Sequence, residues 1–223
     1  MFVTGTDTGV GKTLVSAGLL HALARHHPRV VGMKPVAAGT ELFNGVPANE
    51  DVLALRAASS CRVPPELDNP VLLPDPLSPH IAAARAGVRI DIGHLVACQR
   101  ALALQADAVV VEGAGGVMVP LSATETGADL AEALGLPVLL VVGLRLGCLN
   151  HALLTAQAIR ARGLTLAGWV ANHVDSAMLA QDDNVAFLQR QLQAPLLARI
   201  AHQAAPDPRT LAFDLLPEWT SSR

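Results

Sequence analysis

A glycine-rich segment, Gly5 to Thr13, joins a short apolar run to a stretch with helical periodicity. Glycines allow backbone N–H groups to turn inward around phosphate oxygens, and a helix N-terminus adds the positive end of its dipole. In the common motif G-x-x-x-x-G-K-[ST], the lysine reaches the β- and γ-phosphates and the hydroxyl residue binds Mg²⁺. Lys12 and Thr13 occupy these positions, whereas Thr6 stands where the first glycine is usual, so the loop is one residue longer. The segment predicts a phosphate-binding loop for ATP or GTP.

Strand-like and helix-like segments alternate along the rest of the chain. Low aromatic content, 3%, and 51% hydrophobic residues suit strands of Leu, Val and Ile buried on both faces. We expect strands at 2–4, 29–33, 108–111, 138–142, 166–171 and 196–200. We expect helices at 13–25, 49–58, 82–86, 92–106, 149–162 and 178–193. This alternation predicts a single α/β domain over residues 1–223, with a doubly wound, mainly parallel sheet and helices on both faces. The tail after Pro206 receives no assignment.

Charge and cysteine usage exclude several classes of protein. A net charge of −3 without a basic stripe argues against a nucleic-acid binder or a polybasic membrane surface. Cys61, Cys98 and Cys148 are far apart and form no C-x-x-C pair, which favours a reducing compartment. The chain shows no signal-peptide pattern, and its most apolar stretch, Leu136 to Leu144, is too short to cross a bilayer. We therefore expect a cytoplasmic protein.

The stretch from Cys61 to Pro79 is rich in proline. Proline removes a backbone donor and disfavours helix interiors. We therefore expect an ordered excursion or loop here, with neither a helix nor a core element. The prolines are Pro64, Pro65, Pro70, Pro74, Pro76 and Pro79.

Two acidic positions are candidate Mg²⁺ ligands. Glu112 follows the apolar run 108–111 and precedes four small residues, Gly113 to Gly116, which would let the backbone approach a ligand. A Mg²⁺ bound at a phosphate loop needs such an acid at the end of a neighbouring strand. Asp51 is less distinctive, because an Asn-Glu-Asp sequence opening a helix is more often an N-cap with favourable dipole charge.

Lys34 ends the second expected strand, at the edge where ligands bind in open α/β sheets. It is either a solvated lysine or a group that holds an anion near the γ-phosphate. The segment from Gly143 to His151 repeats the strand–glycine–helix order and suggests a second anion site, such as one for a carboxylate. His151 is interpreted equally well as an acid–base group or as an ordinary residue at a helix start.

Together these segments resemble the dethiobiotin synthetase family. The similarity runs in order through nearly the whole chain, and the longer phosphate loop is itself a trait of that family. The matching segments are F-V-T-G-T-D-T-G-V-G-K-T at 2–13, K-P-V-A at 34–37, S-P-H-I at 78–81, V-E-G-A-G-G at 111–116, G-C-L-N-H-A at 147–152, L-A-G-W-V-A-N at 166–172 and A-P-L-L at 194–197.

The resemblance implies an ATP-dependent cyclo-ligase. In that family 7,8-diaminopelargonate, CO₂ and ATP give dethiobiotin, ADP and phosphate. The reaction passes through a carbamate and a carbamic–phosphoric anhydride, which the second amine closes into a cyclic urea. The resemblance also implies Mg²⁺ as cofactor and a homodimer with the substrate site at the subunit interface.

Site residues follow from the resemblance position by position. Lys34, Lys12 and Thr8 are the implied catalytic residues, and Thr13, Asp51 and Glu112 the implied Mg²⁺ ligands. The implied ATP-binding residues are Gly9, Val10, Gly11, Lys12, Thr13, Asp51, Glu112, Gly113, Ala114, Gly115, Asn172, His173, Ala201, His202 and Gln203. The implied substrate-binding residues are Lys34, Ala38, Gly147, Cys148, Leu149 and Asn150.

The chain departs from the family pattern in three places. Ala38 stands where Ser or Thr commonly contacts the substrate, with Thr40 nearby. Residues 198–201 read A-R-I-A, where a close family member has G-E-I-P. This difference weakens the expectation that Ala201 to Gln203 contact the adenine. The family also has an acidic residue that contacts the ribose, and Asp207 is the nearest candidate for it in this chain.

Two other functions share this fold. A partitioning or switch ATPase carries a lysine early in the phosphate loop, where this chain has Thr6-Asp7-Thr8. A corrinoid amidotransferase-like synthase usually carries a glutaminase domain, for which 223 residues leave no room.

Overall fold

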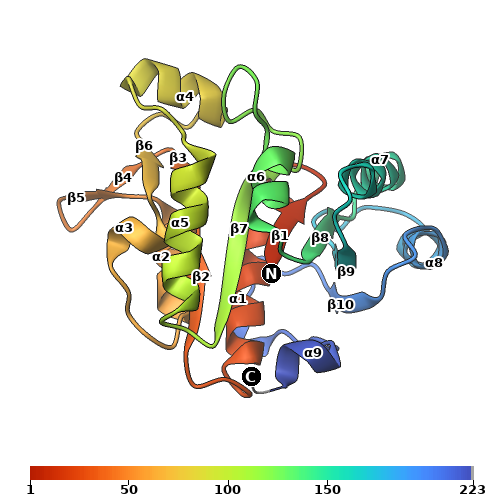
Figure 1. Ribbon diagram of the computed structural model, residues 1–223. Helices are drawn as coiled ribbons and strands as arrows, with labels where there is room; N and C mark the ends of the chain where they lie inside the picture. The colour runs from red at the N-terminus through yellow and green to blue at the C-terminus, as the bar shows by residue number, and fades with distance from the viewer. Residues whose placement is uncertain (222–223) are drawn as a thin grey trace.

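The computed structural model describes residues 1–221 and contains a central six-stranded parallel sheet with helices on both faces (Figure 1). The expected fold class is therefore confirmed; positions 222 and 223 of the expected domain lie outside the described residues. The strands, in the order in which they lie in the sheet, are β10 (Leu196–Ile200), β9 (Leu166–Asn172), β8 (Val138–Gly143), β1 (Phe2–Gly5), β7 (Ala108–Gly116) and β2 (Val30–Met33).

Helices cover the sheet in two groups. One face is covered by α1, α2 and the C-terminal tail, and the other by α5, α6 and α7 with their neighbours. The helices are α1 (Lys12–Leu23), α2 (Glu50–Ala58), α3 (Pro65–Asp68), α4 (Pro79–Ala86), α5 (Ile92–Ala103), α6 (Gly127–Leu134), α7 (Cys148–Ala161), α8 (Gln181–Gln191) and α9 (Pro217–Thr220), with a 3₁₀ turn at Pro208–Thr210.

Alternation along each strand divides the core between the two faces. Phe2 packs with the α5–α7 side and Val3 with the α1 side, and Leu139 and Leu140 divide in the same way. Successive side chains of a strand point to opposite faces, so a strand buried on both faces must be apolar throughout. This requirement explains the continuous aliphatic runs of the sequence.

The direction of winding reverses at β1. Its two neighbours are β7 and β8, and β2 lies beyond β7, so the chain builds outward from β1 in opposite directions. In open parallel sheets ligands bind outside the carboxyl ends of the strands at such a point. The glycine-rich loop leaves β1 at this edge and enters α1. The topology therefore places the predicted phosphate site at the switch point.

The proline-rich stretch contains more structure than its composition suggested. The short helix α3 begins at Pro65, where the missing N–H is one that a first turn leaves unpaired anyway. Strand β6 (Val71–Leu73) pairs in parallel with β3 (Val36–Ala38), and Val71 and Leu73 are buried. The expectation that this stretch holds neither helix nor core is wrong, because its prolines fall at element ends.

A small antiparallel hairpin projects beside β3. It consists of β4 (Glu41–Phe43) and β5 (Val46–Ala48), joined by Asn44 and Gly45, both with positive φ. Asn and Gly are the residues that tolerate this conformation. The hairpin connects the end of β3 to the start of α2 and so borders the edge described below (Figure 1).

The tail after Pro206 packs along α1. Leu211 and Phe213 contact the apolar cluster of that face, Trp219 is buried in it, and the Trp219 carbonyl accepts a hydrogen bond from His27 Nε2 at 2.7 Å. A Cβ on Gly18 would lie 2.8 Å from Leu211 Cδ1 and 3.1 Å from the Pro208 carbonyl oxygen. The tail therefore requires a glycine on the facing turn of α1.

Gly18→Ala is expected to lower the free energy of unfolding by about 1–2 kcal/mol, since overpacking outweighs the gain in helix propensity. Urea unfolding measures the change. Ser16→Ala is the matched control on the same helix, because the buried Ser16 hydroxyl has no hydrogen-bond partner within the described chain, and it is expected to be neutral or stabilising. An unchanged unfolding midpoint in Gly18→Ala would show that the tail does not press on α1.

Within residues 1–221, no helix is both long enough and apolar enough to cross a membrane.

Candidate active site

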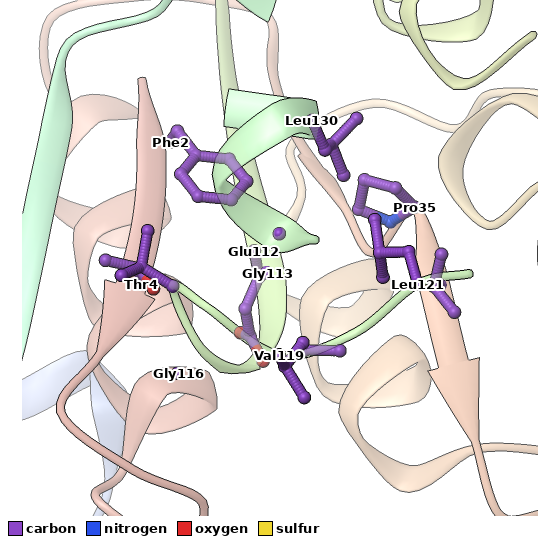
Figure 2. Close-up of a pocket in the computed structure, with 13 residues that line it drawn as sticks. Phe2, Thr4, Pro35, Glu112, Gly113, Gly116, Val119, Leu121 and Leu130 are labelled. Carbon is purple, nitrogen blue, oxygen red and sulfur yellow. The ribbon is translucent and has the colours of Figure 1, made fainter. Parts of the chain in front are cut away.

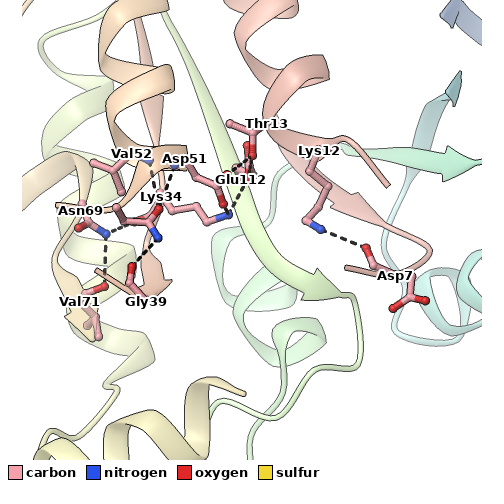
Figure 3. A network of polar contacts seen from close by, with 11 residues as sticks. Asp7, Lys12, Thr13, Lys34, Gly39, Asp51, Val52, Asn69, Val71 and Glu112 are labelled. Carbon is pink, nitrogen blue, oxygen red and sulfur yellow. Dashed lines mark hydrogen bonds and ion pairs between the residues drawn. The ribbon is translucent and has the colours of Figure 1, made fainter. Parts of the chain in front are cut away.

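Four polar side chains from four elements meet at the carboxyl edge of the sheet (Figure 3). Lys34 directly follows β2, and Glu112 lies in the neighbouring strand β7. Met33 and Val111, the residues just before Lys34 and Glu112, are partners in the strand register, so the two side chains start from adjacent positions. Thr13 and Asp51 come from the first turns of α1 and α2. Parallel strand ends and helix starts thus converge on one point.

Lys34 holds the two carboxylates together. Its Nζ donates to Asp51 Oδ2 at 2.8 Å and to Glu112 Oε1 at 2.6 Å. The Thr13 hydroxyl lies 2.6 Å from Asp51 Oδ1 and 2.9 Å from Glu112 Oε1, and its single hydrogen can be donated to only one of them. The other contact brings two acceptor oxygens together without a proton between them, an arrangement that favours a nearby cation.

The cluster is deeply buried and charged. Glu112 is 0% exposed and the side chain of Lys34 5% exposed. Burial by itself lowers the pKa of Lys34, but the Glu112 and Asp51 carboxylates raise it above its usual value overall. Burial likewise opposes ionisation of Asp51, yet Lys34 and the Thr13 hydroxyl hold the pKa of that carboxyl below its usual range. Lys34 is therefore an ammonium ion paired with carboxylates at neutral pH.

Lys12 is oriented differently from Lys34. Its Nζ donates to the Asp7 carbonyl at 3.1 Å, within the glycine-rich loop (Figure 3). Burial, with the nearby charge of Lys34, lowers the pKa of Lys12. Asp7 in turn pairs with Arg145 at 2.5 Å, which ties the loop to the segment after β8. Lys12 and Lys34 are the only lysines in the sequence, and the other permanently charged basic side chains are arginines.

The glycine-rich loop is tightly packed against the end of β9. Gly11 has φ +89°, and a Cβ there would lie 2.2 Å from Asn172 Nδ2, so only glycine fits. Asn172 Nδ2 donates to the Val10 carbonyl at 2.9 Å, and the Val10 side chain is buried in the core. Of the implied nucleotide residues, Val10 and Asn172 therefore make structural contacts with each other in this chain.

His173 is also engaged within the protein. Its Nδ1 donates to Gln181 Oε1 at 2.6 Å, and its Nε2 accepts from Arg199 Nε at 2.9 Å. Both ring nitrogens of His173 are thus engaged by side chains of the protein. Ala201 to Gln203 follow β10 and are exposed.

An open cavity of about 840 Å³ covers the cluster. It brings together many of the implied site residues: Thr8, Gly9, Gly11, Lys12, Thr13, Lys34, Ala38, Asp51, Ala114 and Gly115. It does not include Val10, Glu112, Gly113, Asn172, His173, Ala201 to Gln203 or Gly147 to Asn150. Glu112 reaches the cluster from beneath, through its contacts with Lys34 and Thr13.

Sequence reasoning did not assign several residues of the cavity wall. They are Asn49, Glu50, Pro76, Leu77, Ser78, Pro79 and Val119. The only available signal was the S-P-H-I segment of the family resemblance, which includes Ser78 and Pro79. The others come from the start of α2, the proline-rich stretch and the loop after β7, which the fold brings to the same edge of the sheet.

A second, enclosed cavity beside β7 is too small for a substrate. It is lined by Phe2, Thr4, Pro35, Leu121 and other residues around the glycines that follow Glu112 (Figure 2). Its volume is about 10 Å³, roughly one water at most. It is therefore a packing void rather than a binding site.

The oxygen atoms of Thr13, Asp51 and Glu112 fit a Mg²⁺ ion. All three are hard oxygen donors of the kind that Mg²⁺ prefers. Glu112 Oε2 is buried and has no hydrogen-bond partner within residues 1–221, which is costly for a carboxylate oxygen unless a ligand meets it. The donor set and this unpartnered oxygen agree with the sequence prediction.

A family model described as an AAA domain matches residues 1–210. The chain belongs to this family. Solved structures with the same P-loop NTPase fold include a ParA family ATPase from Chlorobium tepidum TLS, with a TM-score of 0.55, 16% identity and 91% and 83% coverage of this chain and that one. The septum site-determining protein MinD of Pyrococcus horikoshii OT3, complexed with Mg-ADP, matches with a TM-score of 0.56 at 18% identity. The match covers 91% of this chain and 81% of that one.

The fold also extends to a different branch of nucleotide-binding proteins. The signal recognition particle receptor FtsY from Elizabethkingia anophelis, in complex with GDP, gives a TM-score of 0.56 at 18% identity, covering 98% of this chain and 61% of that one. At such identities the likeness concerns the fold alone. These likenesses show that this AAA-domain chain has the P-loop NTPase fold.

Proposed function

We propose that this AAA-domain chain is a dethiobiotin synthetase, which converts 7,8-diaminopelargonate, CO₂ and ATP to dethiobiotin, ADP and phosphate. The family to which the chain belongs includes such enzymes. The observation that carries the proposal is Lys34, a buried lysine from β2 held beside the Mg²⁺-type oxygens at the floor of an 840 Å³ cavity. A phosphate loop alone needs only Lys12.

The site residues suit each step of this reaction. One amine adds to CO₂ and loses a proton, giving a carbamate whose negative charge Lys34 and Lys12 would stabilise. The carbamate oxygen then takes the γ-phosphoryl group and ADP leaves, with Lys12 and Thr8 beside the transferred group. The second amine attacks the carbonyl carbon and expels phosphate, closing the urea ring. Mg²⁺ held by Thr13, Asp51 and Glu112 would supply charge neutralisation at the phosphates.

We further propose a homodimer in which α7 of one subunit contributes to the substrate site of the other. Gly147 to Asn150 lie outside the cavity of the single chain, as a contribution from a partner would require. Gly147 precedes α7 and supplies no side-chain cap; although the Cys148 N–H donates to the Arg145 carbonyl at 3.0 Å, the positive end of the helix dipole favours a carboxylate there. Leu146 is almost fully exposed beside it. Sedimentation that gives only a monomer would contradict this arrangement.

The reaction is tested by incubating purified protein with ATP, Mg²⁺, bicarbonate and 7,8-diaminopelargonate. We expect ADP and dethiobiotin in equal amounts, measured by mass spectrometry, and no product when bicarbonate or the diamine is omitted. ATP turnover that is independent of the diamine, without dethiobiotin, would instead support a partitioning or switch ATPase.

A further inference from the structure

Glu50 stands where two hollows meet. The 840 Å³ cavity and a smaller hollow of about 190 Å³ beneath the β4–β5 hairpin share four wall residues, Ala38, Asn49, Glu50 and Pro76. Glu50 opens α2 immediately before Asp51, whose carboxylate binds Lys34. Glu50 therefore lines the reaction cavity next to the cluster of Thr13, Lys34 and Asp51.

A buried asparagine holds this wall in place. Asn49 Oδ1 accepts from the backbone N–H of Asp51 at 3.1 Å and caps α2, while Asn49 Nδ2 donates to the Gly39 carbonyl at 2.8 Å. The residue before Glu50 is thus bonded to the residue after Ala38. This hydrogen bond holds Ala38 and Glu50 on the same wall of the cavity.

The carboxylate of Glu50 has no hydrogen-bond or ion-pair partner within residues 1–221. The charged side chains that line the smaller hollow are Glu41 and Glu50, and none of its lining residues is a lysine or arginine. In the larger cavity the two lysines lie on the loop and floor, where Lys34 is paired with Asp51 and Glu112. Among the described residues that line the cavity, Lys12 on the loop is thus a lysine without a carboxylate partner, and Glu50 on the wall is a carboxylate without a cationic one.

We propose that Glu50 binds the substrate amine that is not carboxylated, taking over the polar contact that a hydroxyl residue at position 38 would make. This inference rests on the proposed function. The two amines of the substrate lie on adjacent carbons, so a carbamate at the lysine end leaves the other amine a short distance away. As an ammonium ion that amine is repelled by the lysines and attracted to Glu50. As a neutral amine it still donates a hydrogen bond to the carboxylate.

Glu50→Gln tests the proposal by separating substrate affinity from turnover. We expect the KM for the diamine to rise about three- to tenfold, as for loss of a charged hydrogen bond at a partly exposed site. We expect kcat within about twofold of wild type and an unchanged Kd for ADP measured by calorimetry. A merely structural role in α2 would lower the unfolding midpoint without this split between KM and kcat.

The matched control is Glu41→Gln, which removes an equal charge from the smaller hollow without touching the larger cavity, and its KM is expected to match wild type. Ala38→Ser introduced into Glu50→Gln is expected to recover at least half of the lost affinity, because it restores a hydroxyl on the same wall. A KM in Glu50→Gln equal to that of wild type or of Glu41→Gln would overturn the proposal. Absence of dethiobiotin with the wild-type protein would overturn the proposed function itself and this inference with it.

Discussion

Lys34→Ala is expected to reduce dethiobiotin formation by about a hundred- to a thousandfold while leaving the Kd for ADP within about threefold of wild type. Removing a single preorganised group that stabilises developing charge costs about this much in other enzymes. ADP affinity is retained because Lys34 makes no direct hydrogen bond to the glycine-rich loop, and Lys12 contacts the Asp7 carbonyl instead of the carboxylates that Lys34 binds. Steady-state assays with calorimetry of ADP binding measure both quantities.

The same substitution also removes the countercharge of a fully buried carboxylate. Breaking a buried ion pair costs about 3–5 kcal/mol of unfolding free energy, so the folded state of Lys34→Ala must be verified separately. Arg29→Ala is the matched control, because Arg29 pairs with Asp107 just before the start of β2 and β7, at the far end of these strands from Lys34 and Glu112, and its loss should not slow turnover. Normal turnover at saturating substrate, with only weaker ADP binding, would contradict the role assigned to Lys34.

Glu112→Gln is expected to reduce turnover by about a hundredfold and to remove most of the effect of Mg²⁺ on nucleotide binding. The amide keeps the shape of the side chain but loses the charge that a divalent cation requires. The substitution also removes the carboxylate charge that Lys34 Nζ contacts at 2.6 Å, so the folded state of this variant must be verified separately. Calorimetry of ADP binding with and without Mg²⁺ gives a readout that does not depend on activity.

Glu132→Gln supplies the comparison for Glu112→Gln. Glu132 is exposed on α6, where it contacts Arg162, and its substitution should alter neither turnover nor the Mg²⁺ effect. Undiminished Mg²⁺ dependence in Glu112→Gln would show that Glu112 serves only as the counterion of Lys34.

Part of the fold could be predicted because local and global preferences agree. The aliphatic runs at 108–111 and 138–142 are strands in the structure, and Asn49 caps α2 as its position suggested. Helix α6 was missed because it is short, begins at Gly127 and depends on a capping box between Thr126 and Asp129. Helix α8 begins at Gln181 instead of 178, after Ala180 adopts a positive φ.

Some residues of the candidate site could likewise be predicted from the sequence, and others could not. Lys12, Thr13, Lys34 and Glu112 could be chosen from the sequence because each follows or begins an element with a clear apolar pattern. Asp51 was less distinctive, since its pattern also describes an ordinary helix start, and only the family resemblance implied its role as a ligand. The structure makes the difference by placing Asp51 Oδ2 2.8 Å from Lys34 Nζ.

The longer glycine-rich loop, the strand-end acid and the strand-end lysine are local features, so the sequence by itself determined that this chain has a P-loop fold. Tertiary structure alone decided what surrounds them. The residues that flank the hairpin and part of the proline-rich stretch form the cavity wall, and contacts between distant segments, such as the one from Thr13 to Asp51, bring them to the glycine-rich loop. Such contacts depend on chain topology and leave no periodic signal, which is why Glu50 became a candidate only once the fold was known.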